Sequence, residues 1–222
     1  RQRDVIVLLS CLVRRVLIFS KLIRKIEART SQREFWNTRN QIFGSNEGPE
    51  SKLLDRTVVS TDCKDISIVA SQFGAEVLQR PKDLATDEST TISVLGHIAE
   101  QFPEVNTFIV LQPTSPLRDD GLIDECIEEY ERGEFTNLAT GFWCKYQEFG
   151  THNNTRRQDV SGFFYDDGSI YVLDRSLIEK GFWSGNKVCR KEIKRYQNYE
   201  IDDDVDLVVL EALMKKYKGN HS

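Results

Sequence analysis

The sequence has few of the features that mark disulfide-rich or thiolate-metal proteins. Its five cysteines, in a chain of 222 residues, include no CxxC pair and are odd in number. That pattern argues against a disulfide framework and against a zinc site built from thiolates. We therefore expect reduced thiols and a cytoplasmic protein. The cysteines are Cys11, Cys63, Cys126, Cys144 and Cys189.

A long uninterrupted apolar run is also missing. The most apolar stretch, residues 5–26, is broken at Ser10 and again at Arg14 and Arg15, whereas a membrane-spanning helix needs roughly 20 apolar residues. No small-residue cleavage site follows, so we expect neither a secretory signal nor a membrane partner. The stretch is more typical of a helix with one apolar stripe. That stripe would contain Leu9, Leu12, Val13, Val16, Phe19 and Ile23.

Positive charge is not in excess. Thirty lysines and arginines stand against 35 aspartates and glutamates, a formal net charge of −5, so nothing favours a nucleic-acid partner. An anionic ligand would need a few placed cations or a metal ion. The chain contains no repeat or low-complexity tract, and its length suits one sizeable α/β domain with its own core.

From residue 52 onward, short β-rich runs alternate with helical stretches. This alternation predicts an α/β fold with a mostly parallel sheet covered by helices. Strands are predicted at 56–60, 75–78, 107–111 and 137–142, and helices at 64–73, 91–101, 119–132 and 207–216. The aromatic, glycine-rich region 144–183 has hairpin-like strands and is predicted to form an arm or a lid.

Polar residues follow the predicted strands. Asp62 comes just after the first of them, and the segment from Gln112 to Arg118 follows the strand 107–111. In open α/β sheets, ligands bind beyond the carboxyl ends of the strands. Pro113 and Pro116 stiffen the second segment and would hold Gln112, Thr114 and Ser115 in a rigid turn. The turn predicts the floor of a crevice for a polyhydroxylated or carboxylated ligand, with a ligand-free surface turn as the alternative.

Two further segments carry cations. Arg80 precedes a proline-stiffened loop and could pair with a phosphate or with nearby carboxylates. Asp87 or Ser89, at the end of that loop, is expected to cap the helix that follows. Arg157 lies in Arg-Arg-Gln-Asp, where one guanidinium could hold a carboxylate through two hydrogen bonds, or the group could form a solvated charge cluster.

The acidic segment 200–206 is the most informative. If its first part is extended, Glu200 and Asp202 lie on one face. Two such carboxylates suit Mg²⁺, which completes its coordination with phosphate oxygens and water. The alternative is an acidic loop that caps the C-terminal helix, which would account for Asp203, Asp204 and Asp206.

Taken in order, these segments resemble the acylneuraminate cytidylyltransferases, also called CMP-sialic acid synthetases. The resemblance runs from ESKLLDRTVVSTD at residue 50 through RPKDLATD, LQPTSPLR, RRQD and DDGSIYVLD to YEIDDDVDL. It implies a Rossmann-like nucleotidyltransferase fold, with helices on both faces of the sheet and a small dimerisation arm. The implied reaction joins CTP to a nine-carbon keto-sugar acid with Mg²⁺, releases pyrophosphate, and takes place in a homodimer.

The resemblance also implies roles for single residues. Gln112 would bind the sugar acid, Arg157 its carboxylate, and Tyr171 would line the sugar pocket. Phe182 and Trp183 would reach across the dimer. Arg80, at the nucleotide end, would act in catalysis with Glu200 and Asp202, which occupy the positions of the metal-binding Asp-x-Asp of the family. Substrate-binding residues are then expected at Asp62, Asp87, Gln112, Thr114, Ser115, Arg157, Tyr171 and Phe182.

The front of the chain departs from this pattern. The family opens with a strand and a glycine-rich loop that cradles the CTP phosphates, whereas no glycine precedes Gly44 here. We expect an atypical segment at 1–49, a core at 50–143 and 186–222, and an arm at 144–185, with reduced activity. The alternatives are a synthetase for a related acid (3-deoxy-octulosonic, legionaminic or pseudaminic) and a non-catalytic dimeric remnant.

Overall fold

The computed structural model describes residues 5–10, 51–72, 74–112 and 114–217. Its strands are β1 Val5–Ser10, β2 Arg56–Thr61, β3 Glu76–Gln79, β4 Thr107–Leu111, β5 Asn137–Cys144, β6 Phe163–Asp174 and β7 Val188–Glu192. The α-helices are α3 Lys64–Gln72, α4 Thr91–Gln101, α5 Leu122–Arg132, α6 Arg175–Glu179 and α7 Asp204–Tyr217. Short 3₁₀ turns are η1 Lys82–Leu84, η2 Arg157–Asp159 and η3 Arg195–Gln197. None of the helices in these ranges is long and apolar enough to cross a bilayer.

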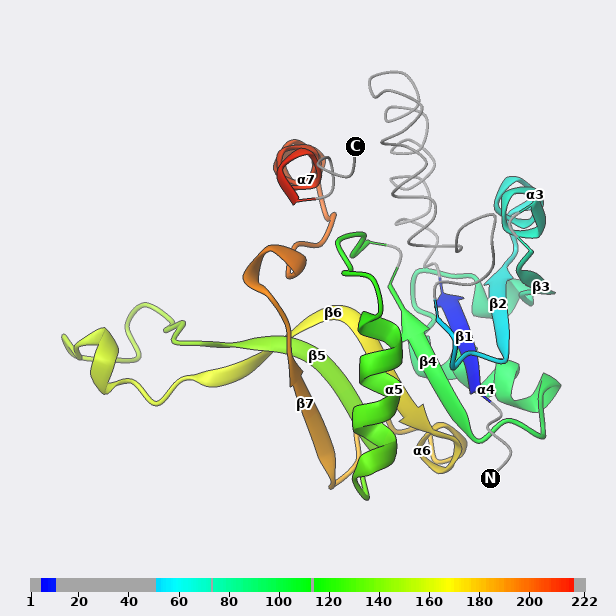
Figure 1. The fold of residues 1–222 in the computed structure, drawn as a ribbon, viewed down its shortest axis with the longest axis horizontal. Coiled ribbons are helices and arrows are strands. Elements are labelled where there is room, and N and C mark those ends of the chain that lie inside the picture. The colour runs from blue at the N-terminus through cyan, green and yellow to red at the C-terminus, as the bar shows by residue number, and fades with distance from the viewer. Residues whose placement is uncertain (1–4, 11–50, 73, 113, 218–222) are drawn as a thin grey trace.

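The strands form one sheet in the order β3-β2-β1-β4-β6-β5-β7 (Figure 1). Neighbouring strands are parallel except at β6, which runs antiparallel to both β4 and β5. The chain steps outward from β1 to β2 and β3, and then returns to place β4 on the other side of β1. The predicted α/β class with a mostly parallel sheet is confirmed, and the strand order reverses between β1 and β4.

Alternating side chains on the central strands build a core on each face of the sheet. On β4, Ile109 and Leu111 join the cluster formed with α3 and α5, whereas Phe108 and Val110 join the cluster formed with α4 and α6. All four residues are buried, and each such side chain stabilises the fold by about 1.5–3 kcal/mol. Helices therefore cover both faces, as predicted.

β1 corrects one prediction. Residues 5–10 form a strand rather than the start of an amphipathic helix, and Val7 pairs with Thr57 of β2 and with Ile109 of β4. The continuous apolar run VIVLL suits a parallel strand buried on both faces, and periodicity alone does not separate such a run from a buried helix. The atypical segment thus supplies a strand at the centre of the sheet. The rest of the predicted helix, from residue 11 onward, lies outside the described residues.

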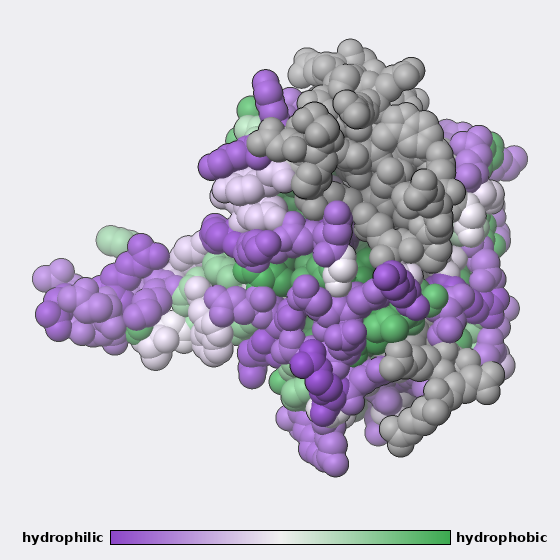
Figure 2. Space-filling view, in the orientation of Figure 1, coloured by the Kyte–Doolittle hydropathy of each residue, from purple (hydrophilic) through white to green (hydrophobic). Residues whose placement is uncertain are grey.

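The predicted arm is also too long. The second half of β6 pairs with β4 from Thr107 to Leu111 and therefore belongs to the core. The part that projects from the body consists of the outer ends of β5 and β6 and of the connection between them, residues 145–162 (Figure 1). We call this part the arm. α4 and β4 have the predicted bounds, and the other predicted elements are present with shifted ends; α5 begins at Leu122 and α7 at Asp204. Figure 2 shows a mostly hydrophilic face on which apolar residues appear mainly in a band running inward from the arm.

Candidate active site at the carboxyl ends of the central strands

The polar turn after β4 lies at the point where the strand order reverses. Ser115 N donates to the Gln112 carbonyl (3.1 Å) and closes the turn. Thr114 and Ser115 are buried, whereas Gln112 is half-buried. Ligands of open α/β sheets bind at this reversal, beyond the carboxyl ends of the strands. The structure therefore places the three predicted residues at the position where open α/β sheets bind their ligands.

This turn is joined to the acidic segment that precedes α7. Ile201 N donates to the Thr114 carbonyl at 2.9 Å, and Ser115 Oγ donates to Glu200 Oε1 at 3.3 Å across 85 residues of sequence. Behind the contact, Ile201 packs in an apolar cluster with Leu117, Leu207 and Leu210. The structure thus brings together Thr114, Ser115 and Glu200, which were predicted separately.

Gly168 is a site residue that our sequence reasoning missed. Its φ is +71°, and a Cβ added to it would lie 2.1 Å from Glu200 Oε1. β6 runs antiparallel to β4 with Ile170 opposite Leu111, so Gly168 reaches the carboxyl end of β4. Glycine is required here both by the left-handed backbone and by the close approach of Glu200. An isolated glycine between Asp167 and a run of strand-forming residues was the available signal.

Tyr171 lies in the interior and holds the neighbouring Asp166. Its hydroxyl donates to Asp166 Oδ1 at 2.7 Å, and Gly168 N donates to the same oxygen at 3.0 Å. The Tyr171 ring packs edge-on against Trp183 with centroids 4.7 Å apart. Burial, and then the nearby Asp166 carboxylate, raise the pKa of the Tyr171 hydroxyl, so it remains a neutral donor.

A buried arginine ties the two strand ends together. Arg118 is 2% exposed, and its Nη2 donates to the Gln112 carbonyl (2.7 Å) and to the Ser169 carbonyl (2.8 Å). Our sequence reasoning saw Arg118 only as the end of the proline-rich turn. Because one nitrogen donates to both carbonyls, the turn after β4 and the part of β6 beside Gly168 are held in a fixed relation.

Asp167 lies in the same buried network. Its Oδ1 accepts hydrogen bonds from Thr140 Oγ1 (2.7 Å) and Ser169 N (3.0 Å). Burial is the largest influence and raises the pKa of the Asp167 carboxyl, while the hydrogen bonds and the charge of Arg118 act in the opposite direction. The network therefore includes a carboxylate that is costly to ionise.

Arg80 and Asp62 lie along the same edge of the sheet, at the ends of β3 and β2. Arg80 is buried, and its guanidinium donates to Ser60 Oγ (3.2 Å) and to the Ser60 carbonyl (2.5 Å). It thereby connects the carboxyl ends of β2 and β3. Asp62 is exposed just after β2.

Asp87 is exposed in the loop after η1, and the prediction that Asp87 or Ser89 caps the next helix is wrong. Thr90 is the N-cap of α4, since its side chain accepts from Ser93 N at 3.2 Å. Ser89 Oγ instead donates to the Asp83 carbonyl. A capping side chain must lie directly before the first helical residue, and α4 begins at Thr91.

Arg157 and Phe182 are not brought to this site within the chain. Arg157 is exposed on the projecting arm, in η2 (Figure 1). Phe182 is 57% exposed and follows α6, on the side where Asp174 pairs with the first residue of β4. Trp183, predicted to reach a partner subunit, packs against Tyr171 of its own chain.

Glu200 and Asp202 fit a magnesium ion. Ile201 between them is buried, whereas Glu200 is half-buried and Asp202 is exposed, so neither carboxylate-bearing residue is buried in the core. Mg²⁺ is commonly held by one or two carboxylates together with phosphate oxygens and water. The described ranges contain no group of three or more His, Cys, Asp and Glu residues that could hold a metal ion.

The remainder of the acidic segment caps α7. Asp203 Oδ1 accepts from Val205 N (2.7 Å) and Asp206 N (3.1 Å), and Asp206 Oδ2 accepts from Asp202 N (2.8 Å). The predicted capping role is confirmed for Asp203 and Asp206. Glu200 takes no part in these capping hydrogen bonds; its side chain contacts Ser115 and lies against Gly168.

The sequence model of a family described as cytidylyltransferase matches residues 46–213. The N-acylneuraminate cytidylyltransferase of Oncorhynchus mykiss is 28% identical over 184 residues, which cover 76% of this chain and 42% of that protein. The N-acylneuraminate cytidylyltransferase of Escherichia coli O18:K1:H7 is 33% identical over 82 residues, which cover 37% of this chain and 20% of that protein. The chain spans less than half the length of these curated relatives.

Solved structures show the same fold. A 4-diphosphocytidyl-2C-methyl-D-erythritol synthase from Anaerococcus prevotii superimposes with a TM-score of 0.63 at 11% identity, covering 96% of both chains. A CMP:2-keto-3-deoxy-manno-octonic acid synthetase complexed with CTP gives a TM-score of 0.59 at 10% identity, covering 97% of this chain and 99% of the other. The Rossmann-like nucleotidyltransferase fold is confirmed.

Proposed function

Because the chain belongs to the cytidylyltransferase family, we propose that it transfers the cytidylyl group of CTP to a keto-sugar acid of the sialic-acid type and releases pyrophosphate. The similarity to N-acylneuraminate cytidylyltransferases over three quarters of the chain supports this substrate class. A related keto-sugar acid with the same carboxylate and polyhydroxyl groups would suit the same polar turn.

The observation that carries the proposal is the contact of the turn after β4 with Glu200. It sets an amide and two hydroxyl-bearing residues, suited to a polyhydroxylated acid, beside a carboxylate suited to a metal. Both substrates are anions, and two unit charges 4 Å apart repel by about 1 kcal/mol in water and about 4 kcal/mol near a protein surface. A site for this reaction must offset that repulsion while aligning the reactants.

Each residue then has a defined task. Gln112 would orient the sugar acid so that its anomeric hydroxyl lies in line with the α-phosphorus of CTP. Glu200 and Asp202 would hold Mg²⁺, which when bound neutralises charge on the phosphate oxygens. Ser115 and Gly168 keep the Glu200 carboxylate at one place in the crevice.

We infer that the active form is a homodimer built through the arm. Trp143, Tyr146, Phe163 and Tyr165 on the arm are 45–59% exposed, and exposed aromatic groups of this kind mark interaction surfaces. In a dimer, Arg157 of one subunit would approach the crevice of the other. Light scattering on the Trp143→Lys variant tests this: a dimeric wild type and a monomeric variant are expected, and a monomeric wild type contradicts the inference.

We also propose that the protein works slowly and in the cytoplasm. The segment that follows β1 contains no glycine before Gly44, so its sequence lacks the glycine-rich motif whose backbone N–H groups would cradle the CTP phosphates. The cysteines of the described ranges, Cys63, Cys126, Cys144 and Cys189, are free thiols, which supports a reducing compartment.

The reaction is tested by measuring pyrophosphate release from CTP, Mg²⁺ and N-acetylneuraminate, with other keto-sugar acids as competitors. We expect slow, magnesium-dependent turnover that falls at least about 100-fold in Glu200→Gln, because the lost charge weakens metal binding. Glu104→Gln, an exposed carboxylate at the opposite end of the sheet, is the matched control and should have no effect. No turnover and no calorimetric binding of CTP, in a chain that still dimerises, would identify a non-catalytic remnant.

A further inference from the structure

Asp166 presents a carboxylate that is fixed at one oxygen and open at the other. It is exposed on β6. Its Oδ1 accepts from the Tyr171 hydroxyl (2.7 Å) and from Gly168 N (3.0 Å). Within the described ranges, no residue donates a hydrogen bond to its Oδ2. A buried phenol and a backbone N–H therefore fix one oxygen of an exposed carboxylate and leave its other oxygen available to a ligand.

The position of Asp166 is beside the crevice. The glycine whose N–H it accepts is the same glycine against which Glu200 lies. The strand register sets Ile170 opposite Leu111, the last residue of β4, so Asp166 to Ser169 extend beyond the end of β4. Arg118 further ties the Ser169 carbonyl to the Gln112 carbonyl. Asp166 is therefore connected through Gly168 to Glu200, and through the neighbouring Ser169 and Arg118 to Gln112.

The chemistry of the group narrows the ligand it would take. No three carboxylates of the described residues are grouped so that they could hold one metal ion, so Asp166 does not join Glu200 and Asp202 as a third metal ligand. A carboxylate oxygen is an acceptor only, and its hydrogen bonds with neutral donors are stronger than those between neutral groups. Of the groups on a keto-sugar acid, the hydroxyls are the donors that match it, whereas a phosphate or the sugar carboxylate would be repelled.

We propose that Asp166 is a further substrate-binding residue, whose open oxygen accepts hydrogen bonds from hydroxyl groups of the sugar acid, and that Tyr171 is a positioning residue acting through Asp166. This inference rests on the proposed function. It changes the role expected for Tyr171, which does not line the sugar pocket but fixes the group that does.

The surroundings of Tyr171 suit this role. Its side chain is buried, its ring lies edge-on against Trp183, and its hydroxyl donates to Asp166 Oδ1. Fixing the Asp166 carboxylate before substrate arrives removes the entropy that a free side chain would lose on binding. The hydroxyl also stays protonated because burial and Asp166 raise its pKa.

The test separates substrate affinity from folding. In the full chain, Asp166→Asn should raise the KM for N-acetylneuraminate about 10- to 100-fold, as expected for one lost hydrogen bond to a charged group. The KM for CTP should stay unchanged. Tyr171→Phe should raise the sugar KM about 3- to 10-fold, and the double variant should be no worse than Asp166→Asn alone, because the two residues act in series.

Tyr130→Phe is the matched control. Tyr130 is 9% exposed, against 8% for Tyr171, but it is packed in the cluster on the opposite face of the sheet. It should leave both KM values unchanged. Equal effects of the two Tyr→Phe changes, additive effects of Tyr171→Phe and Asp166→Asn, or an unchanged sugar KM in Asp166→Asn would overturn the inference while leaving the reaction intact. Absence of turnover in the wild type would instead overturn the proposed function, and this inference with it.

Discussion

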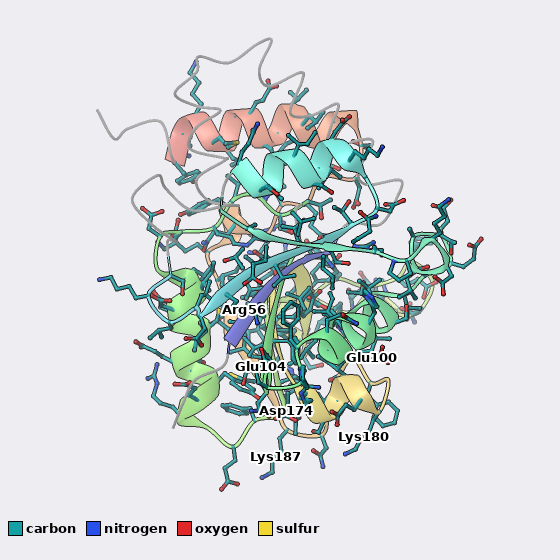
Figure 3. The ribbon with its side chains drawn as sticks, turned by 90° about the vertical axis from the view of Figure 1, so that its right-hand side faces the viewer. Arg56, Glu100, Glu104, Asp174, Lys180 and Lys187 are labelled. Carbon is teal, nitrogen blue, oxygen red and sulfur yellow. The ribbon has the colours of Figure 1, made fainter. Side chains whose placement is uncertain are left out.

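The two ends of the parallel part of the sheet use arginine in opposite ways. At the amino end, Arg56 of β2 binds Glu76 through two hydrogen bonds (2.7 and 2.5 Å), binds Glu104 at 3.0 Å, and lies 4.3 Å from the centre of the Phe102 ring. Figure 3 shows Arg56 and Glu104 close together at this end. Its side chain is 34% exposed. At the carboxyl end, Arg118 is almost completely buried and donates to backbone carbonyls.

The difference teaches what each arginine is for. Exposed ion pairs are screened by water and salt and contribute about 0–1 kcal/mol. A buried guanidinium has a large desolvation cost, and keeping one is reasonable where fixed geometry matters more than stability. The carboxyl end therefore has the character of a site, and the amino end that of an ordinary solvated surface.

The largest expected effect is the loss of stability on replacing Arg118, which tests the contrast between the two arginines. Arg118→Met should lower the free energy of unfolding by about 3–5 kcal/mol, because it removes a buried charged donor and leaves two carbonyls without it. Urea denaturation followed by circular dichroism measures this. If Arg118→Met lowers the free energy of unfolding no more than Arg56→Met does, the hydrogen bonds of the buried Arg118 do not stabilise the fold.

The next effect concerns Gly168 and Glu200. Gly168→Ala should lower kcat/KM about 100-fold, since the new methyl group displaces the Glu200 carboxylate that we propose binds metal. Adding Glu200→Asp should recover part of that loss, because the shorter side chain restores the space. If the double variant is as poor as Gly168→Ala alone, the left-handed backbone rather than the contact with Glu200 requires glycine here.

A third prediction concerns pH, where the two ends should have opposite signs. Burial raises the pKa of the Asp167 carboxyl, so its stabilising contribution is present below the unfolded pKa and is lost as pH rises through the folded pKa. The hydrogen bond from Arg56 lowers the pKa of Glu76, so its contribution is present above the unfolded pKa and is lost as pH falls.

Denaturation of Asp167→Asn and Glu76→Gln between about pH 3 and pH 7 tests these signs, using each wild-type-minus-variant difference in free energy of unfolding. The difference should decrease with rising pH for Asp167 and increase for Glu76. Slopes of the same sign would show that burial does not dominate at Asp167.

The smallest effect is expected at Arg56. Arg56→Met should change the free energy of unfolding by less than about 1 kcal/mol, because both of its partners are exposed and screened. The apolar replacement keeps much of the contact with Phe102. Thermal melts in low and high salt measure this, and a large loss that salt abolishes would place Arg56 in a stronger network than its exposure suggests.

The sequence predicted the carboxyl end of the sheet well where turn chemistry is local. Gln112, Thr114 and Ser115 follow an unmistakable apolar strand, and the two prolines in the sequence predict a rigid turn. Glu200 could be placed on one face with Asp202 from alternation alone. That Ser115 would donate to Glu200 depends on residues 85 positions apart, and only the sheet order brings them together.

Other features were beyond local reasoning. Val5–Ser10 has a pattern shared by buried strands and buried helices, and only pairing with β2 and β4 decides between them. Gly168 is needed because of a side chain from a distant segment, which no short window of sequence contains. Arg118 could not be separated from a surface arginine, since burial follows from packing rather than from its neighbours in sequence.

β6 connects the arm directly to the body of the sheet. One continuous backbone runs from Phe163 and Tyr165 in the arm, through the aspartate–glycine turn, to Tyr171 and the body of the sheet. A force applied to the arm, for example when another molecule binds it, would pass along this strand to Gly168, where the pairing with β5 shifts its register. A change in how the arm assembles with another molecule would then change the position of the residues around Gly168.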